Sequence, residues 1–107
     1  MTNNHFLNIG VLLYGCGHHQ AAWRMKDSNI EDIGNISYYQ HLAQIAEKGL
    51  LDIVFFADNQ SFNASDNTTM SAFWFDPIIN LSAIAQVTSH IGLVPTISST
   101  FSNPFTA

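Results

Sequence analysis

The stretch from Leu50 to Ala57, LLDIVFFA, decides the fold of this chain. It has the length of a β-strand, it follows Gly49 and it ends at Asp58. Apart from Asp52 its side chains are apolar at every position, which is typical of a strand that is covered on both faces. A strand of this kind predicts a parallel sheet with helical crossovers.

Two further apolar runs predict neighbouring strands. One covers residues 6–14 (FLNIGVLLY) and the other covers residues 91–98 (IGLVPTIS). Pro95 weakens the second of these runs, because proline removes a hydrogen-bond donor from the strand ladder. The first run leads into a long loop over residues 15–35, and the central run leads into another over residues 59–75.

Helical patterns separate the three runs. The first helix is predicted over Ile36–Lys48, between an N-cap at Asn35 and a helix-ending Gly49. Its apolar positions follow helical spacing: Tyr38, Leu42, Ile45 and Ala46. The second helix is predicted to begin at Asp76-Pro77 and to end near His90. Its apolar face is predicted to hold Ile78, Leu81, Ile84, Ala85 and Thr88.

The order β-α-β-α-β predicts an α/β fold, for which two architectures are open: a doubly wound sheet and the start of a (β/α)8 barrel. The turn Gly15-Cys16-Gly17-His18-His19 follows the first strand. It lacks the third glycine of a dinucleotide-binding G-x-G-x-x-G turn, and it opens a loop rather than a helix. We therefore expect residues 1–107 to form the first β-α-β-α-β portion of a (β/α)8 TIM barrel. Such barrels typically need about 250 residues, so this portion is incomplete.

The composition excludes several classes of partner. The only lysines and arginines are Arg24, Lys26 and Lys48, eight residues are acidic, and the formal net charge is −5. Nucleic-acid binding requires clustered basic residues and a membrane-surface helix requires a basic face, so neither partner is expected. No apolar run approaches the roughly 18 residues of a membrane span. A single cysteine, Cys16, and an amino terminus without a basic leader favour a cytoplasmic protein.

Five parts of the chain resemble, in order, the motifs of one enzyme family. This is the family of luciferase-like, reduced-flavin-dependent monooxygenases, in particular the group of nitrilotriacetate, dibenzothiophene-sulfone and long-chain-alkane monooxygenases. The matching parts are 17–24 (G-x-H-x-A-A-W-R), 46–58 (A-E-[RK]-G-x-x-D-x-x-F-x-A-D), 76–77 (Asp-Pro for Glu-Pro), 88–93 (T-x-x-I-G-L) and 98–105 (S-T-T-[YF]-x-x-P-[YF]). The family continues beyond the last motif, so the resemblance implies an amino-terminal fragment.

The resemblance implies a barrel in which reduced FMN and O2 oxygenate a small organic substrate through a flavin peroxide. It also implies a separate NAD(P)H:flavin reductase that supplies FMNH2, and a homo-oligomeric full-length enzyme. Because active sites of such barrels lie at the carboxyl ends of the strands, the residues expected to bind FMN are Asp58, Thr96, Ser98 and Thr100. Turn and strand chemistry explains the same residue types without any ligand. No residue is assigned to catalysis.

The two adjacent histidines of the first long loop, His18 and His19, are candidates for binding the substrate. A loop histidine without a ligand is the alternative. Adjacent residues in an extended segment point to opposite sides, so we do not expect the pair to hold a metal ion. No Cys-x-x-Cys or His-x-x-x-His spacing supports a zinc site either.

Two other interpretations of the isolated chain are open. It could be an inactive, truncated remnant of such an enzyme, since three parallel strands leave two unpaired sheet edges. It could also be a small interaction module that dimerises to cover those edges. A content of 47% hydrophobic and 10% charged residues permits the second interpretation, and no motif argues for it.

Overall fold

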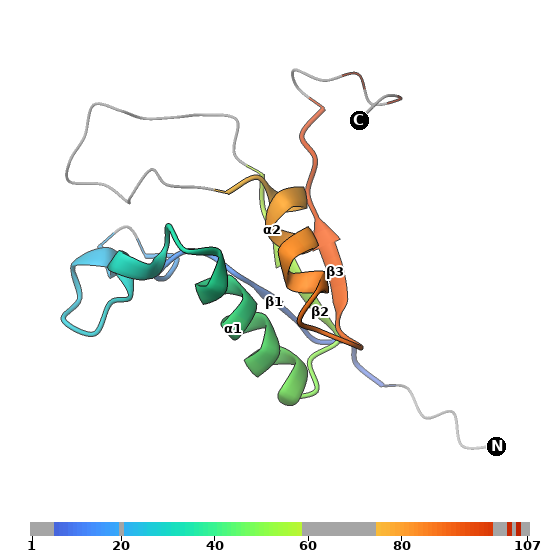
Figure 1. Ribbon diagram of the computed structural model, residues 1–107, viewed down its shortest axis with the longest axis horizontal. Helices are drawn as coiled ribbons and strands as arrows, with labels where there is room; N and C mark the ends of the chain where they lie inside the picture. The colour runs from blue at the N-terminus through green and yellow to red at the C-terminus, as the bar shows by residue number, and fades with distance from the viewer. Residues whose placement is uncertain (1–5, 20, 59–74, 100–102, 104, 106–107) are drawn as a thin grey trace.

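The computed structural model describes residues 6–19, 21–58, 75–99, 103 and 105. Three parallel strands lie side by side in the order β1-β2-β3, and both helices lie in front of them in Figure 1. The elements are β1 (Gly10–Leu12), α1 (Ile36–Lys48), β2 (Ile53–Phe56), α2 (Pro77–Ala85) and β3 (Gly92–Pro95), with short 3-10 turns at Ala22–Arg24 and Ile30–Asp32. The predicted α/β class, element order and parallel pairing are confirmed.

The strands are shorter than the apolar runs that predicted them. Phe6 and Leu7 lie ahead of β1 and are 84% and 87% exposed. At the other end of the sheet, Pro95 pairs with Phe56 as the last residue of β3. β3 is an edge strand of the described sheet, and an edge position tolerates the donor that proline lacks.

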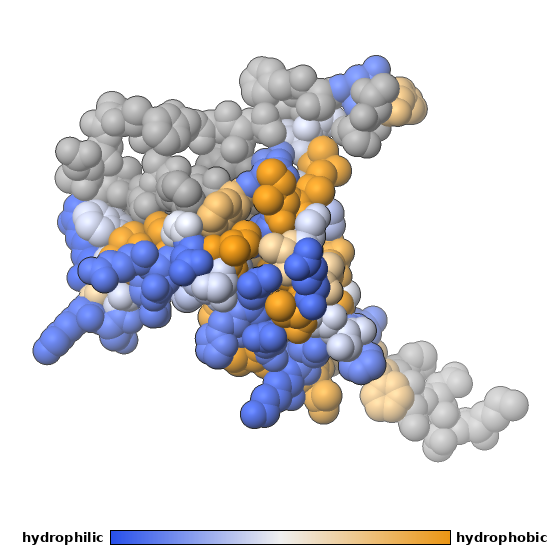
Figure 2. Space-filling model, viewed as in Figure 1, coloured by the Kyte–Doolittle hydropathy of each residue, from blue (hydrophilic) through white to orange (hydrophobic). Residues whose placement is uncertain are grey.

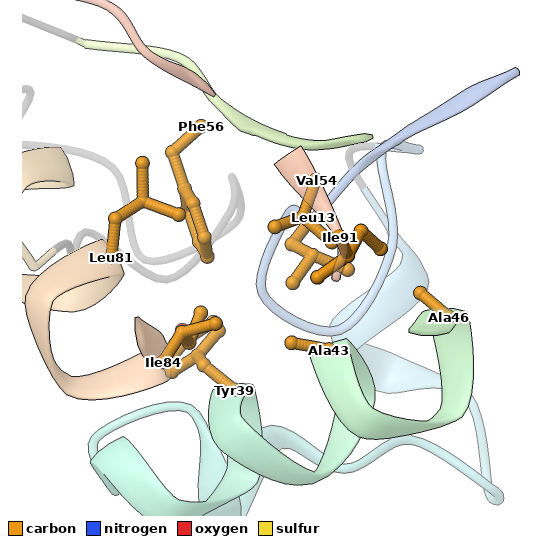
Figure 3. Packing of buried hydrophobic residues seen from close by; sticks show 9 residues of the cluster. All are labelled: Leu13, Tyr39, Ala43, Ala46, Val54, Phe56, Leu81, Ile84 and Ile91. Carbon is orange, nitrogen blue, oxygen red and sulfur yellow. The ribbon is translucent and has the colours of Figure 1, made fainter. Parts of the chain in front are cut away.

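The two faces of the sheet differ. Side chains alternate between faces along a strand, so Val54 and Phe56 point toward the helices whereas Ile53 points away. On the helical side, side chains from the sheet region and both helices point toward one another (Figure 3) and form one core: Leu13, Tyr39, Ala43, Ala46, Val54, Phe56, Leu81, Ile84 and Ile91. On the opposite face Leu12 and Val94 are each 37% exposed, and no helix covers them in the part of the chain that the structure describes.

On this open face, the row of paired residues at the start of the three strands contains only one side chain, that of Ile53. Gly10 and Gly92 flank Ile53 across the sheet. A Cβ atom at Gly10 would clash with Cγ1 of Ile53, and one at Gly92 would lie 2.8 Å from its Cγ2. Ile53 therefore covers both neighbours, as in a barrel interior, where alternate strands supply the side chains of one layer.

Helix α1 has the predicted bounds and caps. The Asn35 side-chain oxygen accepts a hydrogen bond from the Ser37 amide at 3.2 Å, and Gly49 is the C-cap. The helix is tied to α2, because the Gln40 side-chain amide donates to the Ala83 carbonyl at 2.8 Å.

The predicted apolar face of α1 is wrong by one position along most of the helix. The buried residues are Tyr39, Ala43 and Ala46, whereas Ile45 is 54% exposed. The two small alanines lie in the core, and the larger Leu42 packs against it from the edge.

Helix α2 begins as predicted and ends earlier. The Asp76 carboxylate accepts hydrogen bonds from the Ile78 and Ile79 amides at 2.9 and 3.2 Å, which is the expected N-cap. The helix ends at Ala85, and the following residues to His90 form turns. Leu81 and Ile84 are buried as predicted, but Ile78 is 49% exposed and Asn80, at 2%, takes its place inside.

The chain leaves α1 through a Schellman motif with an unusual residue. The Leu50 amide donates to the Glu47 carbonyl at 3.0 Å, and the Leu51 amide donates to the Ala46 carbonyl at 3.1 Å. This motif needs a left-handed residue after the C-cap, where glycine is usual. Leu50 occupies that position with φ 61° and is 88% exposed.

We expect Leu50→Gly to raise the free energy of unfolding by about 1 kcal/mol, because glycine adopts the left-handed conformation without a Cβ clash. Urea denaturation of the 107-residue chain measures the change. Leu50→Ala is the matched control, since it removes the exposed side chain but keeps the Cβ atom. An equal gain in both variants would show that exposure of leucine, and not backbone strain, is the cause.

Two acids of the predicted family motif stabilise the amino-terminal edge of the sheet. The Asp52 carboxylate accepts a hydrogen bond from the Ile9 amide at 2.6 Å and thereby links the start of β2 to the segment before β1. The Glu47 carboxylate accepts hydrogen bonds from three successive amides ahead of β3, those of Ser89, His90 and Ile91, at 2.7–3.0 Å to Oε2. These backbone hydrogen bonds hold the pKa of Glu47 below its ordinary value.

Because its pKa is lower in the folded state, Glu47 stabilises the fold above its unfolded pKa, and this contribution is lost as the pH falls through the folded pKa. We expect Glu47→Gln to destabilise the chain at neutral pH and to flatten the loss of stability on acidification. Urea midpoints from about pH 7 to about pH 3 test this, with Glu31→Gln, an exposed loop glutamate, as the control. If the urea midpoints of the wild type and of Glu47→Gln fell equally steeply with decreasing pH, this role of Glu47 would be contradicted.

Among the described residues, no helix is long and apolar enough to cross a membrane.

Candidate functional site

The carboxyl ends of the three parallel strands form one edge, and two of the predicted residues meet there. Asp58 follows β2 and Ser98 follows β3. The Ser98 amide donates a hydrogen bond to Oδ2 of Asp58 at 3.0 Å. Both residues are partly buried, so the carboxylate is held in one orientation at the edge where parallel α/β folds bind ligands.

Thr96 directly follows β3 and continues the hydrogen bonding between β3 and β2. Its amide donates to the Phe56 carbonyl at 3.0 Å, directly after the last pair of β2 and β3. Alternation along the strand places Thr96 on the same face as Val94, away from the helices. Thr100, the fourth predicted residue, lies outside the described residues.

The long loop after β1 starts from the same edge and is tied down at both ends. Its beginning is held by the Tyr38 hydroxyl, which donates to the Gly15 carbonyl at 3.0 Å. Its end is held by the Tyr39 hydroxyl, which donates to the Ile33 carbonyl at 2.9 Å. Two adjacent tyrosines of the first turn of α1 thus close the loop.

Burial is the largest cause that raises the pKa of both tyrosines, for Tyr39 to about 12. The two hydroxyls therefore stay protonated and keep donating at neutral pH. Sequence reasoning placed Tyr38 on an apolar helix face and missed these hydrogen bonds, because their acceptors are backbone carbonyls that no residue type reveals. It also gave Glu47 and Asp52 no structural role of their own.

Both predicted substrate-binding histidines lie exposed in this loop. The ring of His18 lies against that of Tyr14, with ring centroids 4.6 Å apart and the ring planes tilted by 36°. Nδ1 of His19 accepts a hydrogen bond from the Ala21 amide at 3.1 Å. Because Nδ1 is an acceptor, the neutral His19 ring carries its proton on Nε2, which is then a donor.

Trp23 and Arg24 occupy the middle of the loop. The Arg24 guanidinium lies 4.8 Å from the centroid of the Trp23 ring, a cation–π distance. The indole Nε1 of Trp23 is buried and has no hydrogen-bond partner in the part of the chain that the structure describes. A buried polar group without a partner is uncommon and requires an explanation.

The chain resembles several characterised monooxygenases, although no family model matches it. N-acetyl-S-(2-succino)cysteine monooxygenase of Bacillus subtilis (strain 168) is 43% identical over 99 residues, which are 92% of this chain and 22% of that enzyme. Nitrilotriacetate monooxygenase component A of Aminobacter aminovorans is 32% identical over an alignment 117 positions long, gaps included, that covers 99% of this chain and 26% of that protein. The solved structure of EDTA monooxygenase from Chelativorans sp. BNC1 superposes with a TM-score of 0.79 at 28% identity, over 92% of this chain and 24% of that one.

The chain thus spans about a quarter of the length of the curated relatives it matches, at 22% and 26%. The ordered motifs, the parallel β-α-β-α-β unit and these likenesses agree with one another. The chain belongs to the family of luciferase-like flavin-dependent monooxygenases, and its sheet and helices correspond to part of their (β/α)8 TIM barrel.

Proposed function

We propose that this chain supplies the first three strands and two helices of an FMNH2- and O2-dependent monooxygenase that oxygenates a small organic substrate. The observation that carries the proposal is the meeting of Asp58 and Ser98 at the carboxyl edge of the parallel sheet. In barrels of this kind that edge holds the active site.

The residues at this edge suit a flavin. A flavin ring is flat and largely apolar with polar atoms at its rim, and the face below the edge offers Phe55 and Val94. Asp58 would accept hydrogen bonds from the ribityl chain or the ring, and the hydroxyls of Thr96, Ser98 and Thr100 would donate to flavin oxygens. The bound flavin supplies the chemistry with O2, and the chain's own residues bind it, orient it and exclude water.

The proposal extends to a partner and to assembly. We infer that a separate NAD(P)H:flavin reductase delivers FMNH2, and the relative named as component A supports a system of more than one protein. We also propose that the complete enzyme is a homo-oligomer. The 107 residues alone are not expected to turn over substrate, because barrel phosphate sites commonly use the loops after strands seven and eight.

A chimaera tests the proposal. The segment of EDTA monooxygenase that superposes on this chain is replaced by the chain itself, and substrate-dependent O2 consumption is measured with enzymatically reduced FMN. We expect the chimaera to bind FMNH2 and to consume O2. A chimaera that folds, as judged by circular dichroism and size-exclusion chromatography, but binds no FMNH2 would contradict the proposal.

A further inference from the structure

We propose that Tyr14 is a specificity-determining residue of the candidate site, whose ring binds an apolar part of the substrate and limits its size. The inference rests on the proposed function and adds a residue to the same site. Tyr14 lies two residues after the end of β1 and directly before the loop that carries His18.

The side chain of Tyr14 lies on the face of the sheet that points away from the helices. The preceding residue, Leu13, still has strand geometry, because its amide donates to the Phe55 carbonyl at 3.1 Å. The Leu13 side chain belongs to the core on the helical side (Figure 3). Successive side chains of a strand point to opposite faces, so Tyr14 lies on the open face, as Thr96 does.

The neighbours of Tyr14 on this face are uncharged. Two positions beyond the last pair of β1 and β2, the register places Ala57 beside Tyr14, and Thr96 follows on the other side of Ala57. The row before it on the same face is apolar and consists of Leu12, Phe55 and Val94. Burying a charged group against such neighbours costs more than burying an apolar one, so the geometry favours an apolar ligand beside the Tyr14 ring.

Tyr14 is held in place by contacts on both sides of the turn that follows it. Its carbonyl accepts a hydrogen bond from the Gly17 amide at 2.9 Å, and the next carbonyl, that of Gly15, accepts one from the Tyr38 hydroxyl at 3.0 Å. The ring of His18 lies against that of Tyr14, with centroids 4.6 Å apart. Burial raises the pKa of the Tyr14 hydroxyl, so the side chain is neutral at neutral pH. A ring fixed in this way loses little conformational freedom when a ligand packs against it.

Tyr14 also lies between the two groups of predicted site residues. His18 contacts its ring, and Thr96, where we place the flavin, is two strands away, at about 4.8 Å per strand. A substrate held by His18 and oxygenated at the flavin therefore extends past the Tyr14 ring. Figure 2 shows the helical side of the molecule, where the surface of α1 and of the β1 loop is mostly polar. We thus expect an apolar group to bind on the inner side of this loop and not on its outer side.

The first test is an NMR titration of the 107-residue chain with benzyl alcohol, an uncharged probe with an apolar ring. The ring signals of Tyr14 and His18 are expected to shift and to reach saturation. Glycerol at the same concentrations is expected to leave them in place. Phe6 is 84% exposed and serves as the internal control for non-specific contact with the probe. Equal shifts at Phe6 and Tyr14, or no shift at Tyr14, would overturn the inference.

Two variants separate the ring from the hydroxyl. Tyr14→Ala is expected to weaken binding of benzyl alcohol about tenfold, the effect of one aromatic contact, whereas Tyr14→Phe keeps the ring and is expected to bind it like the wild type. Because the ring limits the size of the ligand, Tyr14→Ala is also expected to favour 2-naphthylmethanol over benzyl alcohol more than the wild type does. Circular dichroism checks that both variants fold. Equal losses in both variants would place the effect in the hydroxyl and refute the role of the ring.

The second test uses the chimaera with EDTA monooxygenase, with benzyl alcohol as an inhibitor of substrate-dependent O2 consumption. Tyr14→Ala is expected to raise the inhibition constant about tenfold and to leave the Kd for FMNH2 unchanged. A weaker Kd for FMNH2 with an unchanged inhibition constant would make Tyr14 a flavin-binding residue and overturn the inference. Failure of the proposed function appears separately, as an unmodified chimaera that binds no FMNH2, and the NMR titration, which involves no flavin, then decides on Tyr14.

Discussion

Asp58→Ala in the chimaera with EDTA monooxygenase is expected to weaken binding of reduced FMN by about ten- to a hundredfold. The substitution removes a carboxylate that the Ser98 amide holds at 3.0 Å on the edge where we place the flavin. It also leaves that amide without this acceptor and loosens the end of β3. Anaerobic fluorescence titration with FMNH2 measures the loss, and O2 consumption with substrate measures its effect on turnover.

Asp58→Asn separates the two roles of this residue. Asparagine keeps an oxygen that can accept from the Ser98 amide, but it carries no charge. If Asp58 only joins β2 to β3, the Asp58→Asn chimaera will bind FMNH2 like the unmodified chimaera. If the charge of Asp58 interacts with the flavin, the Asp58→Asn chimaera will resemble Asp58→Ala. An Asp58→Ala chimaera that binds FMNH2 unchanged would remove Asp58 from the site.

Ile84→Ala is expected to lower the free energy of unfolding of the chain by about 2–5 kcal/mol. Ile84 of α2 has no exposed surface and packs in the core beside Tyr39 and Leu81 (Figure 3). The truncation removes buried apolar surface and leaves a cavity that the helices and sheet refill only in part. Such a loss is a large fraction of the stability of a small domain.

Two controls keep this result specific. Ile84→Val removes one methylene group and is expected to cost about 1 kcal/mol. Ile79→Ala removes the same atoms as Ile84→Ala from the same helix, but Ile79 is 63% exposed, so little change is expected. Urea denaturation of all three variants gives the comparison. Similar losses for Ile79→Ala and Ile84→Ala would show that α2 does not pack through Ile84 as described.

The elements of this fold could be predicted from sequence because each carries a local signal. Asn35 and Asp76 mark helix starts through side-chain oxygens that accept backbone amides, and both caps form as predicted. The helix faces could be predicted only in part, because neighbouring positions of α1 carry apolar side chains and the sequence does not say which of them face the core. Ala43 and Ala46 are buried, whereas the larger Ile45 is 54% exposed.

The candidate site, too, could be predicted only in part. The position of Asp58 and Ser98 after two adjacent strands predicted that they share an edge, and they do. The hydrogen bonds from Tyr38 and Tyr39 to the β1 loop could not be predicted, since their acceptors are backbone carbonyls, which every residue possesses. The flavin contacts of Asp58, Thr96, Ser98 and Thr100 remain predictions, as do the substrate contacts of the loop.

A crystal structure of the chimaera with bound FMN would show where the flavin lies relative to this chain. We expect the flavin to lie against the carboxyl edge of the three strands and Asp58 to contact its ring or ribityl chain. A flavin held entirely by other parts of the barrel, with Asp58 and the segment 96–100 out of contact, would contradict it.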